Sequence, residues 1–348
     1  MFLYGKEWTR REAEARIGKL GQIGGVRRLS LTEGTEAGTE LIEVRTGAGL
    51  SLEIVPSKGL DIGAARLWGA SISWQSPNGD VHPSFYEPEG AGWLRTASGG
   101  LLMTCGLSHA GSPSADESGS HGLHGRAHHT PAKNVCAREE WVGDELEWSV
   151  SGVVEETAIF GSKLRLVREY SGRLGSNRVT IRDAVENVGF RPAEHMMLYH
   201  FNFGFPLLDE RAEIRLPAAT SEVRAGGRAS LERCRSWEAP DAEAEETVYY
   251  HQVDRASLGP DGLAEAGVFQ PAFPAGPGTR PVAVSLRWSA GALPLLVQWR
   301  MPGAGEHVLG LEPANCRVEG RETERQRGGP IVLKPGGSVS YRIELNVG

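Results

Sequence analysis

The chain has 348 residues, of which 40% are hydrophobic and 23% are charged. These proportions are ordinary for a globular protein with a sizeable core, and they exclude a largely disordered chain. The formal net charge of −7 argues against nucleic acid as the main partner, because phosphate binding needs a basic stripe and none is present.

The chain opens with the one segment that reads clearly as helix. Thr9-Arg10-Arg11-Glu12 has the spacing of a capping box, and apolar residues follow at helical spacing. We expect residues 1–25 to form an N-terminal extension with a short helix. Charge comes too early for a signal peptide, and no apolar run approaches transmembrane length. We therefore expect a cytoplasmic protein without a membrane partner.

From Val26 onward, apolar residues alternate with polar ones, which is typical of half-buried strands. Leu146, Trp148 and Val150 show this pattern, and Val339 to Val347 repeat it at the end of the chain. The 46 glycines and 20 prolines supply dense turn signals between the strands. This predicts an all-β protein with a single domain over 26–348, built as either a twisted sandwich or a closed barrel.

Long loops are predicted from His109 to His121 and from Glu238 to Glu246. The four cysteines, Cys105, Cys136, Cys234 and Cys316, are widely spaced without a CxxC pair. Neither a zinc ribbon nor a disulfide framework is indicated.

The segment Leu198-Tyr199-His200-Phe201-Asn202-Phe203-Gly204 places an imidazole and a carboxamide in an apolar, aromatic strand. Alternate residues of a strand share one face, so His200, Asn202 and Gly204 line one surface. A ligand site would use that polar strip. The alternative is a buried histidine that is satisfied by the backbone.

A second cluster, Ser120-His121-Gly122-Leu123-His124-Gly125-Arg126, lies in a predicted loop, where side chains are free to face a ligand. His128 and His129 are predicted to form an exposed polar turn. The pair His121-x-x-His124 lacks a second matched pair and the HExxH spacing of zincins, so we expect no metal.

In the third cluster, Glu312 ends an apolar strand and precedes Pro313. A buried carboxylate needs either an ion pair, with Arg317 or Arg321, or a catalytic role. An imidazole and a carboxylate, with Arg126, His124 and Asn202 to hold hydroxyl groups, would suit general acid–base chemistry on a polyol. The chain has no GxSxG elbow, Walker loop or GxGxxG after a strand, so we expect no nucleotide cofactor.

Five motifs together resemble the aldose 1-epimerases (galactose mutarotases), and more closely the DUF4432 branch of that superfamily. They follow in order along most of the chain: Val55-Pro56-Ser57-Lys58-Gly59-Leu60-Asp61-Ile62, Thr104-Cys105-Gly106-Leu107, His121-Gly122-Leu123-His124-Gly125-Arg126, Tyr199-His200-Phe201-Asn202 and Leu311-Glu312-Pro313-Ala314-Asn315-Cys316.

The resemblance implies a β-supersandwich with a sugar-binding cleft on its concave face. It also implies that His200 is the general acid that protonates the ring oxygen. Glu312 would be the general base at the anomeric hydroxyl. The family's second histidine would be His124 or, less well, His121, with Arg126 as a hydroxyl ligand.

The chain departs from the family pattern around the substrate. The family's substrate-binding aspartate has no clear match, although Asp254 and Asp261 are candidates, and Tyr250-His251 looks like a feature of this branch. Asn315, Arg317 and Arg321 differ from ordinary mutarotases and would form a cationic rim suited to an acidic sugar.

Two alternatives to an isomerase of a small-molecule sugar stay open at this point. One is a non-catalytic sugar-binding or sensor protein. The other is a metal-dependent sugar isomerase or lyase built around His121, His124, His128 and His200. A homodimer is compatible with the sequence.

Overall fold

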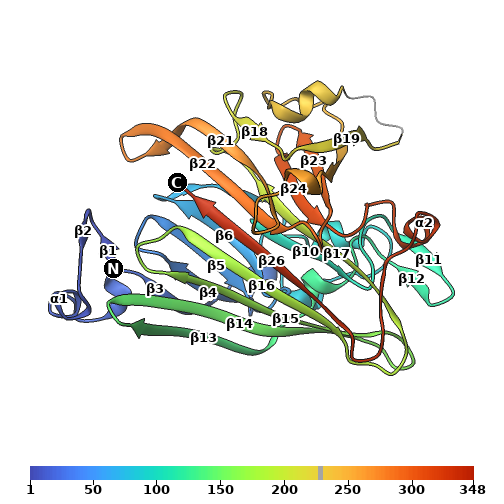
Figure 1. Ribbon diagram of the computed structural model, residues 1–348, viewed down its shortest axis with the longest axis horizontal. Helices are drawn as coiled ribbons and strands as arrows, with labels where there is room; N and C mark the ends of the chain where they lie inside the picture. The colour runs from blue at the N-terminus through green and yellow to red at the C-terminus, as the bar shows by residue number, and fades with distance from the viewer. Residues whose placement is uncertain (226–229) are drawn as a thin grey trace.

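The computed structural model describes residues 1–225 and 230–348 and contains two large antiparallel sheets. The larger sheet has twelve strands (Figure 1). Ten follow the order β19 (Ala219–Val223), β20 (Thr247–Val253), β23 (Leu295–Pro302), β24 (His307–Ala314), β17 (Ala193–Phe203), β10 (Leu102–Leu107), β6 (Asp61–Leu67), β5 (Leu50–Val55), β4 (Glu40–Arg45) and β3 (Gly25–Ser30). Two more attach outside this path, β25 (Ile331–Leu333) to β17 and β7 (Ala70–Ser71) to β6.

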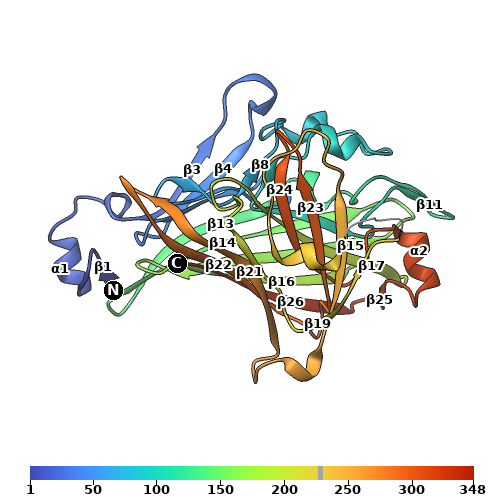
Figure 2. The ribbon, with the colours of Figure 1, turned by 90° about the horizontal axis from the view of Figure 1, so that it is seen from above.

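The smaller sheet has eight strands and packs on the larger one (Figure 2). Their order is β13 (Lys133–Val142), β14 (Glu145–Thr157), β15 (Lys163–Arg173), β16 (Arg178–Asn187), β26 (Ser338–Val347), β22 (Gly278–Ser289), β21 (Leu263–Ala275) and β18 (Glu213–Arg215). The predicted alternation in β14 is confirmed, since Leu146, Trp148 and Val150 are buried. The all-β prediction is confirmed, and of the two architectures it left open the chain adopts the sandwich.

Short elements decorate the two sheets. Three two-stranded sheets pair β1 (Phe2–Leu3) with β2 (Lys6–Glu7), β8 (Trp74–Gln75) with β9 (Gly99–Gly100), and β11 (Ser114–Asp116) with β12 (Gly119–His121). The long loop predicted from His109 to His121 contains the β11–β12 hairpin in its second half. The helices α1 (Arg10–Glu14) and α2 (Arg321–Gln326) lie at opposite ends of the molecule (Figure 1).

The predicted capping box of α1 is present. The Glu12 backbone N–H donates to the Thr9 hydroxyl at 3.2 Å, and the Thr9 N–H donates to the Glu12 carboxylate at 3.0 Å. Within residues 1–225 and 230–348, no helix has both the length and the apolar character needed to cross a bilayer. The division into an extension of 1–25 and one domain of 26–348 stays a prediction.

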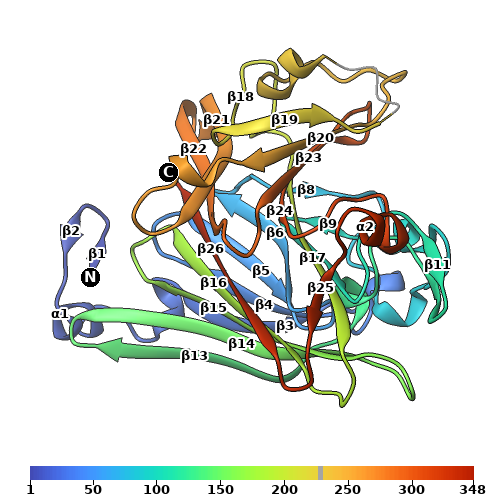
Figure 3. The ribbon, with the colours of Figure 1, turned by 45° about the vertical axis from the view of Figure 1, so that its right-hand side comes forward.

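Strand β17 is buried on both faces, and this explains its nearly unbroken apolar sequence. Tyr199 and Phe201 point into the main core between the sheets. Met196 and Leu198 point the other way, into a second apolar cluster on the outer face of the larger sheet. His200 follows Leu198 on this outer face, as the alternation predicts. In Figure 3, β17 lies beside β24 and β25, with which it pairs.

Candidate active site

A row of side chains crosses the outer face of the larger sheet. The strand register pairs Met103 of β10 with His200 of β17, and Val297 of β23 with Glu312 of β24. Because the β17–β24 ladder pairs Phe201 with Leu311, His200 lies level with Glu312. Neighbours in such a row are close enough for direct contact. The His200 Nε2 atom lies 3.2 Å from Glu312 Oε1.

A cavity of about 520 Å³ opens over this row. Its polar lining includes His124, His200 and Glu312, so three of the predicted site residues share one wall. The other polar lining residues are Ser76, Asn78, Ser112, Arg224, Glu246 and Glu306. The apolar lining residues are Trp74, Pro77, Trp93, Leu94, Ala97, Met103, Leu123, Val248, Val297, Trp299, Met301 and Val318.

His200 and Glu312 are only 6% and 1% exposed. Burial lowers the pKa of His200 to about 4 and raises the pKa of Glu312 well above its ordinary value, because water is excluded from each charged form. Glu246 adds to the rise in the pKa of Glu312 through charge repulsion. Both shifts favour the neutral form of the group, and pairs of titratable groups whose pKa values are moved in opposite directions are typical of acid–base sites.

The two groups touch without completing a hydrogen bond. Glu312 Oε1 and His200 Nδ1 are buried and have no hydrogen-bond partner within the described part of the chain. Buried polar atoms normally find partners, so unpaired ones call for an explanation. A ligand bound in the cavity would supply the missing partners. Both atoms belong to residues that line this cavity.

His124 reaches the cavity from a loop. Its backbone has φ +57°, and its N–H donates to the carbonyl of Gly111 at 2.8 Å. Gly125 follows with φ +72°, where an added Cβ would lie 2.3 Å from the His109 carbonyl oxygen. This tight turn brings the His124 ring within 5.7 Å of the His200 ring, measured between centroids. The Nδ1 atom of His124 has no partner among the residues described.

Gly310 makes room for the Glu312 carboxylate, since an added Cβ would lie 2.3 Å from Glu312 Oε1. Gly310 has no left-handed φ, so the Gly310→Ala backbone is unstrained and the carboxylate has to move. We expect the sugar anomerisation that the family resemblance implies to slow about 10²-fold, since small misplacements of reacting groups have effects of this size. Polarimetry would measure the rate. Gly291→Ala, where nothing lies within 4 Å of the new Cβ, is the control. An unchanged rate in folded Gly310→Ala would show that this carboxylate position is unimportant.

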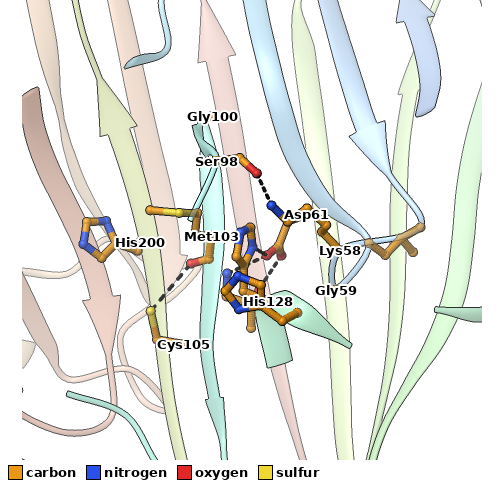
Figure 4. A network of polar contacts seen from close by, with 12 residues as sticks. Lys58, Gly59, Asp61, Ser98, Gly100, Met103, Cys105, His128 and His200 are labelled. Carbon is orange, nitrogen blue, oxygen red and sulfur yellow. Dashed lines mark hydrogen bonds and ion pairs between the residues drawn. The ribbon is translucent and has the colours of Figure 1, made fainter. Parts of the chain in front are cut away.

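A buried polar network supports the wall from beneath (Figure 4). The Asp61 carboxylate accepts from the Thr104 backbone N–H at 2.8 Å and contacts His128 Nδ1 at 2.8 Å. Lys58 lies nearby and donates to Ser98 and to the Thr96 carbonyl. Burial lowers the pKa of Lys58 to about 8.

The prediction that His128 and His129 form an exposed turn was wrong, because they are 2% and 5% exposed. His128 is held by Asp61, and His129 Nε2 lies 2.8 Å from the Thr96 hydroxyl. Both rings pack against Trp93, which lines the cavity. The sequence around His128 and His129 does not indicate that Asp61, Thr96 and Trp93 are their partners. Asp61 does lie within one of the motifs that resemble the family.

The Arg168 side chain links this network to the inter-sheet core. Its guanidinium donates to Asp61 at 2.6 Å and to Asp183 at 2.7 Å, and none of the three side chains is more than 2% exposed. The Tyr199 hydroxyl donates to Asp183 at 2.6 Å. Strand β17, which carries His200, is thus anchored to the core through Tyr199, the residue that precedes His200.

Asn202 faces the same side as His200 but does not line the cavity. Its amide donates to the carbonyls of His200 at 2.9 Å and Gly100 at 3.3 Å, so it holds backbone instead of facing a ligand. Arg126 is exposed and also lies outside the lining. His121 stacks on His109 and contacts Asp116 at 3.2 Å.

The remaining predicted binding residues also lie outside the cavity lining. Tyr250 donates its hydroxyl to Glu319 at 2.6 Å. His251 points to the opposite face, because neighbours on a strand alternate, and it contacts Ser221 and Gln298.

Asn315 accepts the Met197 N–H at 2.8 Å and so holds β17 in place. Arg317 forms an ion pair with Glu222, and Arg321 forms one with Glu194 at 2.6 Å. Because both cations are paired, the expected cationic rim for an acidic sugar is not supported.

Neither candidate for the missing aspartate lines the cavity. Asp254 caps a turn by accepting from the Ala256 N–H at 2.9 Å, and Asp261 pairs with Arg287 at 2.5 Å. Across the described residues, no three histidine, cysteine, aspartate or glutamate side chains are grouped so as to hold a metal ion.

Acid should destabilise the fold through its buried histidines. Burial lowers the pKa values of His109, His195 and His200 from 6.5 to about 4. Their neutral forms favour folding, so this stability is fully present above pH 6.5 and is lost as the pH falls toward 4. Each group contributes up to about 1.4 kcal/mol per pH unit to that slope. Glu312 has the opposite effect on this slope, because its raised pKa stabilises the folded state as the pH falls.

Urea unfolding at about pH 7, 6 and 5 would measure the slope. The variant His195→Gln removes one of these groups, whose ring contacts the Leu107 carbonyl and the Tyr341 hydroxyl at 2.8 Å each. Its slope should be shallower than that of the parent chain. A free energy of unfolding that stays constant from pH 7 to 5 would contradict the expectation.

Comparison with known proteins adds a family and a fold. The family model described as "Domain of unknown function (DUF4432)" matches residues 36–347. A structure of a "putative aldose 1-epimerase" from Klebsiella pneumoniae superposes with a TM-score of 0.84 at 22% identity, covering 92% of this chain and 83% of that chain. A search of curated proteins finds no match.

Two more distant structures share the architecture. The Slr1438 protein from Synechocystis has a TM-score of 0.59 at 15% identity, covering 92% of this chain and 98% of its own. A galactose 1-epimerase from Lactobacillus acidophilus has a TM-score of 0.56 at 11% identity, covering 93% and 98%. At these identities the likeness shows a common fold, the galactose mutarotase-type β-supersandwich.

Proposed function

This chain belongs to the DUF4432 family, and we propose that it is a carbohydrate isomerase that interconverts the anomers of a free aldose or related sugar by general acid–base catalysis. The observation that carries the proposal is the 3.2 Å contact between His200 Nε2 and Glu312 Oε1 in the wall of a cavity. The "putative aldose 1-epimerase" from Klebsiella pneumoniae and the galactose 1-epimerase from Lactobacillus acidophilus share the fold and support the choice of reaction.

The geometry suits the anomeric centre. The ring oxygen and the anomeric hydroxyl are bonded to one carbon, so the groups that serve them have to lie close together. His200 and Glu312 meet this condition from neighbouring strands. An acid and a base placed in this way each typically accelerate proton transfer by about 10²–10⁴-fold.

The proposed reaction conserves protons. Glu312 takes the proton of the anomeric hydroxyl while His200 protonates the ring oxygen, and the bond from the anomeric carbon to the ring oxygen breaks. The open-chain aldehyde turns about its first carbon–carbon bond. The ring oxygen then attacks the opposite face of the carbonyl, and both protons return to their original groups.

The pKa shifts set one requirement for this cycle. Burial favours the neutral imidazole of His200 and the protonated carboxyl of Glu312, since it lowers the pKa of His200 and raises that of Glu312. In this proposal the Glu312 proton passes to His200 when the sugar binds, which gives the imidazolium and the carboxylate that the reaction uses. In this proposal the nearby His124 holds a sugar hydroxyl through its unpaired Nδ1 atom.

Exchange NMR on a panel of aldoses, deoxyaldoses and uronic acids would test the proposal. We expect the protein to accelerate interconversion of the α and β anomers of at least one sugar. Thermal stabilisation by a sugar that is not anomerised would instead indicate a sugar-binding protein. Activity that is lost on chelation and restored by a metal would indicate the metal-dependent alternative.

A further inference from the structure

Three turns lie side by side at one end of the molecule (Figure 1). They join β14 to β15 over 158–162, β16 to β17 over 188–192, and β25 to β26 over 334–337. The Val188 N–H donates to the Lys163 carbonyl at 2.9 Å, which connects the first turn to the second. The Gly336 N–H donates to the Asn187 carbonyl at 2.9 Å, which connects the second turn to the third. These three segments are called the three-turn surface below.

The three-turn surface exposes large apolar side chains. Ile159, Phe160 and Phe190 are 85%, 96% and 96% exposed, more than any other large hydrophobic residue in the described part of the chain. The two phenylalanines alone present about 300–500 Å². This already matches the largest apolar patch of a typical monomer, about 300–600 Å², and patches of that size often mark sites of interaction.

The first turn holds Phe160 in a backbone conformation that aromatic residues rarely adopt. Its φ is +65°, a region that favours glycine and asparagine. The turn is fixed by the Gly161 N–H, which donates to the Ala158 carbonyl at 3.1 Å, and by the Lys163 ammonium, which donates to the same carbonyl at 3.2 Å. A phenylalanine that is both exposed and left-handed is unfavourable in an isolated chain, and contact with a partner would account for it.

Beside the turns, the smaller sheet carries a row of alternating charges. The strand register places Glu155 opposite Arg165, and Arg165 opposite Glu186. Lys133 extends the row from β13, since its Nζ atom lies 2.6 Å from the Glu155 carboxylate. From β13 to β16 the signs therefore run plus, minus, plus, minus.

The next row along these strands is apolar. It consists of Val153, Val167 and Ala184, which the register places opposite one another. The residues between the two rows, such as Val154 and Leu166, point into the core, so both rows lie on the outer face of the smaller sheet. Val167 is 44% exposed there.

We propose that the three-turn surface and these two rows form an interface with a second copy of this chain. A two-fold axis parallel to β14 and β15 sets the turn of this hairpin against its own copy. The same axis reverses the order of the charged row. Lys133 then meets Glu186 of the second copy, and Glu155 meets Arg165 of the second copy. A row of alternating sign is thus complementary to itself.

The size of the surface also suits a second copy. A stable pair of proteins buries about 800 Å² on each partner. The two exposed phenylalanines supply about half of this area, and Ile159, Val167 and the charged row extend it. None of these residues lines the cavity that holds His200 and Glu312, so the inference does not depend on the proposed function.

The variant Phe160→Asn tests the three-turn surface. Asparagine suits the left-handed φ, so the turn and the fold should be kept. Light scattering after gel filtration should give twice the mass of one chain for the parent protein at high concentration. Sedimentation equilibrium should show the dimer Kd of Phe160→Asn weakened roughly 30-fold or more, the effect typical of removing an aromatic anchor from an interface.

The matched control is Tyr4→Asn. Tyr4 is also an exposed aromatic residue with a left-handed φ, at 72% exposure and +55°, but it lies at the other end of the molecule (Figure 1). The same exchange there should leave the dimer Kd unchanged.

Two charge variants, Lys133→Glu and Glu186→Lys, test the two-fold arrangement. Each change alone sets like charges against each other in a pair of identical copies, so each variant should dimerise more weakly than the parent chain. A mixture of the two variants restores opposite charges and should recover the dimer. If the mixture associates no better than either variant alone, the reversed row is not the contact and the inference is overturned.

Other outcomes would also overturn the inference. One is a parent chain that stays monomeric at every concentration, and another is a Phe160→Asn variant that dimerises as tightly as the parent. A third is binding of the monomer to phosphatidylserine vesicles that is lost in Phe160→Asn, since the surface would then serve a lipid membrane. Anomer interconversion by the Phe160→Asn monomer reports separately on the proposed function, because Phe160 lies outside the cavity lining.

Discussion

Replacing Glu312 by glutamine should lower the rate of anomer interconversion by about 10²–10⁴-fold, the range typical for loss of a general acid or base. Glutamine keeps the size of the side chain but cannot accept the anomeric proton. The fold should survive, because removing a buried carboxyl with a raised pKa relieves an unfavourable burial. Polarimetry or exchange NMR on the best sugar of the panel would measure the effect.

The matched control is Glu210→Gln, which makes the same chemical change at an exposed position. Its rate should equal that of the parent chain. Circular dichroism and thermal unfolding would confirm that both variants are folded. A folded Glu312→Gln variant with full activity would remove Glu312 from the mechanism and, with it, the main support for the proposed acid–base pair.

Replacing Arg168 by methionine should lower the free energy of unfolding by about 3–5 kcal/mol. The guanidinium is fully buried and bridges Asp61 and Asp183 at 2.6 and 2.7 Å. Without it, two carboxylates in the core lose their cation. A loss of this size is a large share of the stability of a typical domain. Urea unfolding at pH 7 would measure it.

Arg165→Met on the same strand provides a matched control. Arg165 pairs with Glu186 at 2.6 Å, but their side chains are 39% and 37% exposed. Such surface pairs contribute about 0–1 kcal/mol. If Arg168→Met were no more destabilising than Arg165→Met, the buried network would have no special role in holding the strand that carries His200.

The sequence predicted the strands well because a sheet with one buried face leaves a period of two in the residues. That period also placed Tyr199 and His200 on opposite faces of β17, as the structure shows. The same alternation predicts that Tyr250 and His251 lie on opposite faces of a strand, so they cannot line the same site. The neighbours of a strand residue alternate whatever the function of the segment.

The contact between His200 and Glu312 could not be read from periodicity. It depends on which strands are adjacent and on their register, and these are set by packing between residues more than 100 positions apart. The resemblance to a family supplied the pairing instead. His128 and His129 show the same limit, since their burial follows from Asp61, Thr96 and a tryptophan far away in sequence.

The residues expected to bind hydroxyl groups illustrate a further limit. Asn202, Asn315 and Arg317 are polar residues near the right strands, but each completes a bond within the protein. Residue type and position along the chain do not reveal whether a side chain faces a ligand or a neighbour. Trp93 was not predicted as a site residue, because an aromatic residue in a loop is usually part of the apolar core.

The most direct test of the proposed chemistry compares a free sugar with its methyl glycoside. Ring opening needs the proton of the anomeric hydroxyl, and a methyl group removes that proton without changing the rest of the sugar. We predict that the protein accelerates α to β exchange of the free sugar, as measured by exchange NMR, and leaves the methyl glycoside unchanged. Hydrolysis of the glycoside, or no acceleration for any free sugar, would contradict acid–base anomerisation at His200 and Glu312.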